Sequence, residues 1–88
     1  EPFGAIDPIT REELQDEFIK LRQQLDATII FVTHDIFEAF KIGTQVAIMN
    51  NGKIAQIGTP QHILSDPADD FVKRFTAKHK EALQKEIL

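Results

Sequence analysis

The segment at residues 28–33 constrains the fold more than any other part of this chain of 88 residues. Its sequence, TIIFVT, is β-branched or aromatic throughout and does not alternate between apolar and polar residues. A strand of this kind is typical of the centre of a parallel sheet, where both of its faces are covered. Such a strand needs a neighbour on each edge, and the rest of the chain offers too few strands. We therefore expect an α/β fold with an incomplete sheet.

Helices are expected on both sides of this segment. Asp7 and Pro8 have the residue types of an N-cap and a first helical position. Apolar residues then recur at helical steps, which predicts a helix over residues 8–25; they are Leu14, Phe18, Leu21 and Leu25. After the segment, Asp35 and Glu38 stand three residues apart, the spacing of a capping box at the start of a short second helix.

A tight hairpin is expected in the second half of the chain. Two apolar runs, residues 45–49 and 53–57, flank the sequence Asn-Asn-Gly at 50–52. Asn-Gly in this position predicts a two-residue hairpin turn, because both residues accept a positive φ. Short helices should follow the hairpin, each with a cap at its N-terminus, and the expected caps are Thr59 and Asp66.

Composition excludes several classes of protein. There are no cysteines, so the chain holds no disulfide framework, no cysteine-based zinc site and no thiol nucleophile. The longest apolar runs, residues 29–32 and 46–49, are four residues long, whereas a membrane helix needs about 20. The net charge of -4 argues against a general nucleic-acid surface. A chain of this length can form only one modest core.

Four polar residues stand at or beyond the ends of predicted elements, where an open α/β sheet keeps its ligands; they are Glu1, Asp7, His34 and Asp35. Each also has an ordinary structural reading, as a solvated residue, a helix cap or a loop histidine. A free-standing metal hydrolase built from these four is one alternative. It is disfavoured because two of them already serve as caps and no histidine pair has metal-ligand spacing. We assign no role to His62 or His79.

Three short motifs follow one another along the chain: EPFGAIDP at residues 1–8, THD at 33–35 and GTP at 58–60. Together they resemble the second half of the nucleotide-binding subunit of ATP-binding-cassette (ABC) transporters. Glu1-Pro2 resembles the end of the Walker B segment, residues 3–7 the D-loop, and residues 33–35 the switch-histidine loop. Ile6 stands where this family more often has Leu. The closing hairpin and GTP also fit the family.

The resemblance implies a partial P-loop NTPase core with one parallel-type central strand, a β-hairpin and flanking helices. Residues 1–76 would form the C-terminal part of a nucleotide-binding domain, from the catalytic Glu onward. Residues 77–88 would be a polar C-terminal helix or linker. The chain would thus be a C-terminal fragment of such a subunit.

The resemblance also implies roles for individual residues. Glu1 would polarise the water that attacks the γ-phosphate, and His34 would contact that phosphate; these are the expected catalytic residues. Gly4 and Asp7, in the D-loop, would lie at the seam between two ATP-binding subunits. The cofactors of the parent subunit would be ATP and Mg²⁺, with no metal ligand expected within this chain.

The phosphate-binding loop of such a subunit is absent from these residues. None of the four glycines is followed by Lys-Ser or Lys-Thr, as the motif GxxxxGK[ST] requires. The Mg²⁺-binding Asp, the Q-loop and the signature motif of the family would also lie upstream. Since backbone amides and a Lys on the phosphates supply most of the nucleotide affinity, we expect the isolated chain neither to bind nor to hydrolyse ATP. It should need no cofactor.

Two surface segments, DPITREELQDEF and DPADDFVKRF, most resemble the importers of glycine betaine, proline and related osmoprotectants, such as choline and carnitine. Importers of amino-acid-like solutes are near relatives. The resemblance implies a transport-coupled ATPase that is cytoplasmic and peripheral on the inner face of the cell membrane. Its partners would be a second ATPase subunit and a membrane-spanning permease, with no nucleic acid involved.

The alternative is a self-associating or regulatory module that is not an enzyme. An apolar strand that lacks partners invites pairing with a second copy. On this hypothesis the isolated chain forms a homo-oligomer or a strand-swapped dimer, which would complete the sheet.

Overall fold

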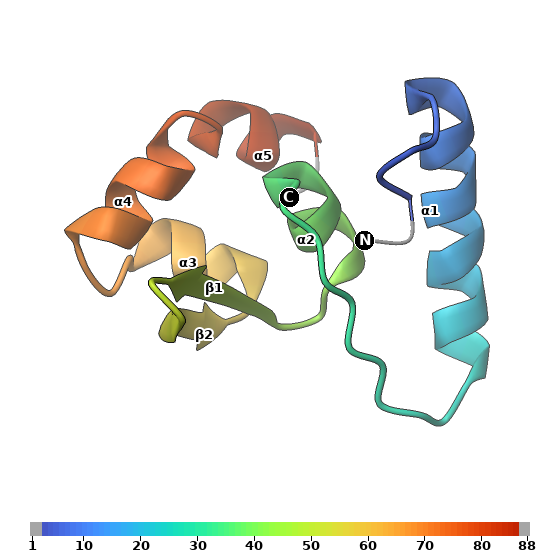
Figure 1. The fold of residues 1–88 in the computed structure, drawn as a ribbon, viewed down its shortest axis with the longest axis horizontal. Helices are drawn as coiled ribbons and strands as arrows, with labels where there is room; N and C mark the ends of the chain where they lie inside the picture. The colour runs from blue at the N-terminus through green and yellow to red at the C-terminus, as the bar shows by residue number, and fades with distance from the viewer. Residues whose placement is uncertain (1–2, 87–88) are drawn as a thin grey trace. The chain divides into compact units, whose positions relative to one another are not determined.

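The computed structural model describes residues 3–86. It contains helices and strands in the order α1 (Pro8–Gln24), α2 (Ile36–Ile42), β1 (Val46–Asn50), β2 (Lys53–Gly58), α3 (Pro60–Ser65), α4 (Asp70–Ala77) and α5 (Lys80–Glu86) (Figure 1). The chain divides into two compact units, with the boundary between Ile42 and Gly43. We describe each unit by itself.

Helix α1 begins and ends almost where the sequence predicts. The side chain of Asp7 accepts a hydrogen bond from the Thr10 amide at 3.0 Å, and Pro8 takes the first helical position. At the other end Leu25 has an extended backbone, and its amide donates to the Arg22 carbonyl. The only buried residue of this helix, which is described over its whole length, is Gln15. Two of the apolar residues whose spacing predicts this helix, Leu14 and Leu21, are exposed.

The prediction of a central strand at residues 28–33 is wrong. The structure has no regular secondary structure there, and the segment runs as an irregular link from α1 to α2 (Figure 1). The side chains of Ile30 and Val32 are 87% and 69% exposed. A strand is stabilised by hydrogen bonds to a neighbour, and the only strands within residues 3–86 are β1 and β2, which pair with each other. The sequence has strand character, but the described residues supply no partner strand.

Helices α1 and α2 are joined by polar contacts. The side-chain amide of Gln15 donates to the buried Glu38 carboxylate at 2.7 Å. Lys41 donates to the Gln15 side-chain oxygen at 3.3 Å and pairs with Asp16 at 3.0 Å. Arg22 donates to the carbonyl of Ile42. These contacts hold the two helices together across the link between them.

The start of α2 follows the prediction in part. Oδ1 of Asp35 accepts from the amides of Phe37 and Glu38, as an N-cap does. The second half of the capping box does not form, because the Glu38 carboxylate is bonded to Gln15 instead. The Asp35 amide donates to Thr33 Oγ1 at 3.0 Å, so it is satisfied without Glu38.

The hairpin of the second unit is confirmed. Strands β1 and β2 are antiparallel and meet at a turn in which Asn51 and Gly52 have φ of 52° and 76°. These are the positive values that a two-residue hairpin turn requires. The register shifts between Ile48 and Met49, and alternate residues of β1 are buried, among them Val46.

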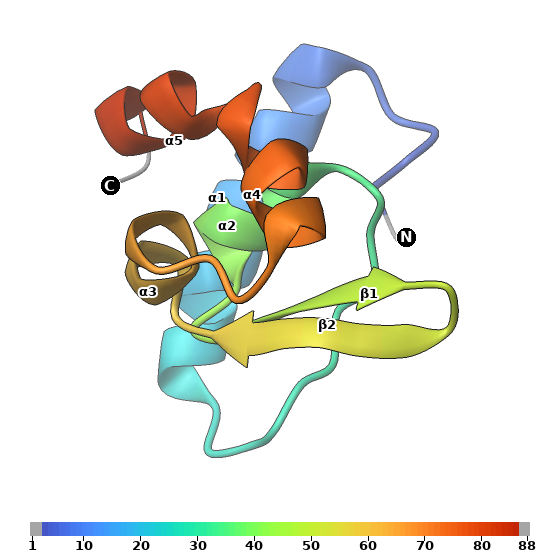
Figure 2. The same cartoon turned by 90° about the vertical axis from the view of Figure 1, so that its left-hand side faces the viewer.

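Helices α3 and α4 pack on β2 (Figure 2). The largest fully buried side chains of the described residues all lie in the second unit; they are Ile63, Leu64, Leu83 and Val72. Leu83 belongs to α5, the helix at Lys80–Glu86, and is its buried apolar residue.

One predicted cap is correct and the other is wrong. Thr59 caps α3 by accepting from the His62 amide at 3.2 Å. The cap of α4 is Asp69, not Asp66, which instead ends α3. The loop between these helices is held by the side chain of Gln56, which bonds the Asp66 carbonyl at 3.0 Å and the Ala68 amide at 2.8 Å. This tertiary contact stabilises a loop where the sequence pattern predicts a helix.

Candidate functional site

The segment that resembles the D-loop folds into a turn just before α1. The amide of Ile6 donates to the carbonyl of Phe3 at 3.2 Å. Asp7 follows the turn, and its carboxylate is exposed while it caps the helix. The hydrogen bond from the Thr10 amide lowers the pKa of this carboxyl below its ordinary value. The turn therefore presents an ionised carboxylate at neutral pH.

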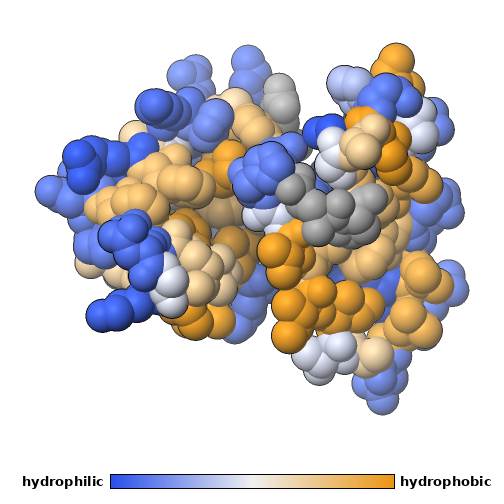
Figure 3. Space-filling model, in the orientation of Figure 1, coloured by the Kyte–Doolittle hydropathy of each residue, from blue (hydrophilic) through white to orange (hydrophobic). Residues whose placement is uncertain are grey.

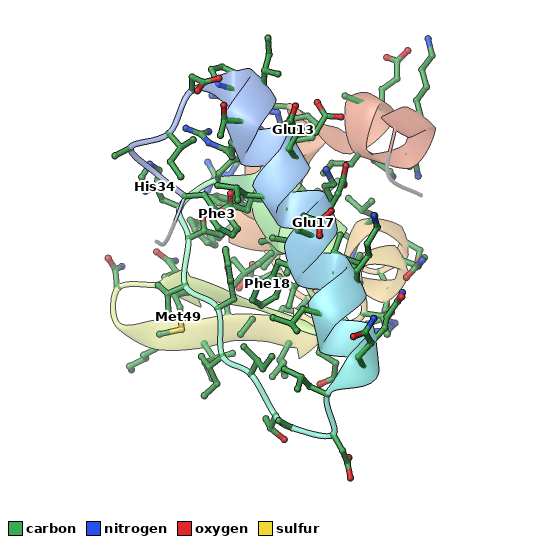
Figure 4. The ribbon with its side chains drawn as sticks, turned by 90° about the vertical axis from the view of Figure 1, so that its right-hand side faces the viewer. Phe3, Glu13, Glu17, Phe18, His34 and Met49 are labelled. Atoms are coloured by element: carbon green, nitrogen blue, oxygen red, sulfur yellow. The ribbon has the colours of Figure 1, made fainter. Side chains whose placement is uncertain are left out.

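An aromatic cluster anchors this turn to the rest of the first unit. The ring of Phe3 lies between α1 and the irregular segment at residues 28–33, where it meets Phe18 (Figure 4). Ring centroids are 6.4 Å apart for Phe3 and Phe18, 5.6 Å for Phe3 and Phe31, and 5.5 Å for Phe18 and Phe31. Two of the pairs are edge-to-face, an arrangement that aromatic quadrupoles favour. The cluster thus holds the turn, α1 and the segment before His34 together.

Arg11, on the first turn of α1, is the polar centre of the site. Its guanidinium donates to the carbonyls of Phe3, Gly4 and Ile6 at 3.2, 3.3 and 3.0 Å. Its remaining nitrogen, Nη1, lies 3.7 Å from Oδ2 of Asp35. The same side chain therefore contacts the turn at residues 3–6 and the loop at residues 33–35.

His34 stands directly before Asp35, and its side chain is exposed (Figure 4). Asp35 uses both of its carboxylate oxygens, since Oδ1 caps α2 and Oδ2 faces Arg11. Asp35 is therefore confirmed as a helix cap, and this capping fixes the backbone next to the histidine.

The predicted site residues are thus placed as follows. Gly4 lies in the turn at residues 3–6 and Asp7 directly follows it, and Arg11 connects that turn to the residue after His34. Glu1 lies outside the described residues. Sequence reasoning missed Arg11, although it is the single basic residue among residues 1–19 and stands four positions after an N-cap. Because residues four apart are neighbours on a helix surface, this spacing places Arg11 next to the turn that precedes α1.

Two features are absent from the part of the chain that the structure describes. Residues 3–86 contain no group of three or more His, Cys, Asp or Glu side chains that could hold a metal ion. No described helix combines the length and the apolar composition that crossing a bilayer requires. A nucleotide-binding site also needs a loop that holds the phosphates, and the sequence contains no such loop. The exposed imidazole of His34 and the ionised carboxylate of Asp7 therefore suit only part of a nucleotide-binding site.

Known proteins similar to this chain are ATP-binding proteins of transport systems. The choline transport ATP-binding protein OpuBA of Bacillus subtilis is 54% identical over 80 residues, which are 91% of this chain and 21% of that protein. The glycine betaine/carnitine/choline transport ATP-binding protein OpuCA of the same organism is 52% identical over 80 residues, again 91% of this chain and 21% of that protein. This homology places the chain in the ABC ATPase family.

A third relative supports the same family. The glycine betaine/proline betaine transport system ATP-binding protein ProV of Escherichia coli is 49% identical over 75 residues, 85% of this chain and 19% of that protein. The resemblance to osmoprotectant ABC ATP-binding proteins is thereby confirmed. No family model matches the chain. The chain spans about a fifth of the length of the curated relatives it matches.

Proposed function

We propose that this chain forms part of the ATP-hydrolysing subunit of an ABC importer for an osmoprotectant. Its solute would be of the glycine betaine, proline, choline or carnitine class, or an amino-acid-like solute. The observation that carries the proposal is the ordered pair of D-loop and switch-histidine motifs in a chain about half identical to such ATP-binding proteins. Residues 1–76 belong to the nucleotide-binding domain, and residues 77–88 follow it.

In this proposal Glu1 and His34 are the catalytic residues. A carboxylate orients or deprotonates the attacking water, a contribution typically worth about 10²–10⁴ in rate. An imidazole donates to the phosphoryl oxygens as charge develops on them. The exposure of His34 supports this role, because its ring is accessible to a ligand.

Gly4 and Asp7 act at the seam between two ATP-binding subunits. The exposed, ionised carboxylate of Asp7 suits a contact with hydrogen-bond donors of a second subunit. The parent subunit works with ATP and Mg²⁺ on the cytoplasmic face of the membrane, docked on a permease.

The experiment compares uptake of labelled glycine betaine and ATP hydrolysis by the complete transporter that contains this chain. We expect His34→Ala to lower ATP turnover about 10²-fold or more and to abolish uptake. The matched control is His62→Ala, which removes an exposed histidine of α3. Full turnover by the His34→Ala transporter would overturn the proposal. Rapid hydrolysis that moves none of the named solutes would overturn only the solute class.

We also propose that the isolated chain neither binds nor hydrolyses ATP. It carries the water-handling motifs without the loop that holds phosphates. Calorimetric titration with Mg·ATP should give no binding heat. Micromolar affinity would contradict this.

A second candidate function, a self-associating module, is favoured by one observation. The irregular segment at residues 28–33 exposes apolar side chains (Figure 3) and lacks a strand partner among the described residues; the exposed side chains include Ile29, Ile30 and Val32. On this proposal a second copy of the chain covers the segment. Sedimentation should then show a dimer that Ile30→Lys converts to a monomer. If the unaltered chain remains a monomer at high concentration, self-association is excluded.

A further inference from the structure

The contacts of Arg11 join two motifs that are far apart in the sequence. Three of its nitrogen-to-oxygen contacts go to backbone carbonyls of the turn at residues 3–6, and one goes to the carboxylate of Asp35. Because these carbonyls belong to the backbone of the turn, they can break their hydrogen bonds to a fixed guanidinium only if the backbone of the turn moves. The position of Arg11 therefore reports the conformation of the turn.

Only an arginine can make these contacts together. A guanidinium is planar, carries five N–H donors in a fixed fork and remains charged. A lysine in the same place would supply one nitrogen on a flexible stem. The side chain of Arg11 is 28% exposed and that of Asp35 is 35% exposed, so solvent screens their attraction only in part.

The other end of the connection is equally constrained. One carboxylate oxygen of Asp35 accepts hydrogen bonds from the amides that begin α2, and the other forms the ion pair with Arg11. A shift of Arg11 therefore changes the position of the Asp35 carboxylate, and with it the backbone beside His34. In the same way, a shift at the start of α2 moves the Asp35 carboxylate and, through Arg11, the turn at residues 3–6.

We propose that Arg11 is a positioning residue that couples the turn at residues 3–6 to the loop at residues 33–35, so that the two move together. The consequence for ATP hydrolysis rests on the function proposed above, because it assigns these segments to the D-loop and the switch-histidine loop. The coupling itself rests on the contacts of Arg11 alone.

Amide hydrogen exchange on the full chain tests the coupling without any activity. In Arg11→Ala we expect exchange to become at least several-fold faster both in residues 3–7 and in residues 33–38. The matched control is Arg74→Ala, which removes an exposed arginine whose Nε donates to a backbone carbonyl within α4. The control should leave both segments unchanged.

The reciprocal variant keeps the experiment decisive if Arg11→Ala loosens the whole unit. Asp35→Asn retains an N-cap but removes the charge that faces Arg11. Exchange in residues 3–7 should rise, although the substitution lies in the other loop, while residues 8–24 stay as protected as before. Unchanged exchange at residues 3–7 in Asp35→Asn would overturn the coupling.

The complete transporter provides the second readout. Arg11→Ala should lower kcat about 10- to 100-fold, the usual consequence of misplacing reactive groups by about 1 Å. The KM for ATP should change less than about twofold, because the phosphate-holding groups lie elsewhere. Arg11→Lys should recover part of kcat, since it keeps the charge facing Asp35.

The outcomes separate the inference from the proposed function. If His34→Ala abolishes turnover and Arg11→Ala leaves kcat unchanged, the role of Arg11 in hydrolysis is wrong and the proposed function stands. If His34→Ala retains turnover, the proposed function is wrong, and hydrogen exchange alone then decides whether Arg11 couples the two loops.

Discussion

The two units of this chain are stabilised in different ways. The first, up to Ile42, carries the segments that resemble the D-loop and the switch-histidine loop. It is held by polar contacts and an aromatic cluster, centred on Arg11, Glu38 and Phe3. The second, from Gly43, carries none of the proposed catalytic residues and is built on a hairpin with buried apolar side chains. Seven of the eleven exposed large hydrophobic side chains of the described residues lie in the first unit.

The difference follows from the sequence distance between interacting partners. A hairpin pairs with residues only a few positions away, so the second unit completes its sheet from its own sequence. A central parallel strand needs partners that are distant along the chain. Where those partners are not supplied, its apolar residues stay exposed.

The largest effect expected from this contrast is on stability. Ile63 is fully buried in the second unit, whereas Ile30 of the first is 87% exposed. We expect Ile63→Ala to lower the free energy of unfolding by about 2–5 kcal/mol, and Ile30→Ala by less than about 0.5 kcal/mol. Urea titration followed by circular dichroism measures both. Equal losses in the two variants would mean that the two units do not differ in this way.

A smaller effect is expected in the polar network of the first unit. Gln15→Ala removes the donor to the Glu38 carboxylate, whose residue is 3% exposed. A hydrogen bond to a charged group is worth about 1.5–3 kcal/mol, so unfolding should become easier by about that amount. Gln23→Ala, an exposed position of the same helix, is the control and should change little. A neutral Gln15→Ala would show that the network contributes little to the first unit.

The hairpin turn should respond to a substitution that touches no neighbour. A Cβ at Gly52 would meet nothing within 4 Å, but the residue has a φ of 76°. Gly52→Ala should therefore cost about 1–2 kcal/mol of unfolding free energy through backbone strain alone. Asn51→Gly, beside it, should be nearly neutral. A stable Gly52→Ala variant with an unchanged hairpin would contradict this account of the turn.

The smallest effect is the pH dependence of the α1 N-terminus. The pKa of Asp7 is lowered in the folded chain by the Thr10 amide, so its contribution to stability is fully present above the ordinary pKa of 3.8. That contribution is lost as the pH falls through the lower folded value. Between pH 5 and pH 2, Asp7→Asn should lose less helix content than the unaltered chain, because its cap does not titrate. Identical acid titrations by circular dichroism would argue against this role of Asp7.

Local features of this chain were predictable from the sequence. The caps Asp7, Asp35 and Thr59, the turn at residues 50–52 and the limits of α1 each depend on residues within a few positions of one another. The family also followed from short motifs in order, and the relatives confirm it. Those motifs are contiguous, so they can be recognised without knowing which segments meet in space.

The remaining features needed contacts between distant residues. The cap of α4 moved to Asp69 because Gln56, on β2, bonds the preceding loop. Glu38 left the capping box because Gln15 of α1 bonds its carboxylate. Gln56 and Gln15 are both too distant along the chain from the residues they contact to be neighbours on one helix. No local sequence pattern therefore predicts these contacts.

Residues 28–33 show this division most clearly. Their sequence sets an intrinsic preference for extended, apolar structure, because β-branched and aromatic side chains favour a pleated surface. Whether such a segment becomes a strand depends on hydrogen-bond partners elsewhere, and only the tertiary structure shows that residues 3–86 provide none. In the same way, the sequence supplied His34 and the turn at residues 3–6 as separate motifs. Their connection through Arg11 appeared only when the chain was folded, since one guanidinium reaches both.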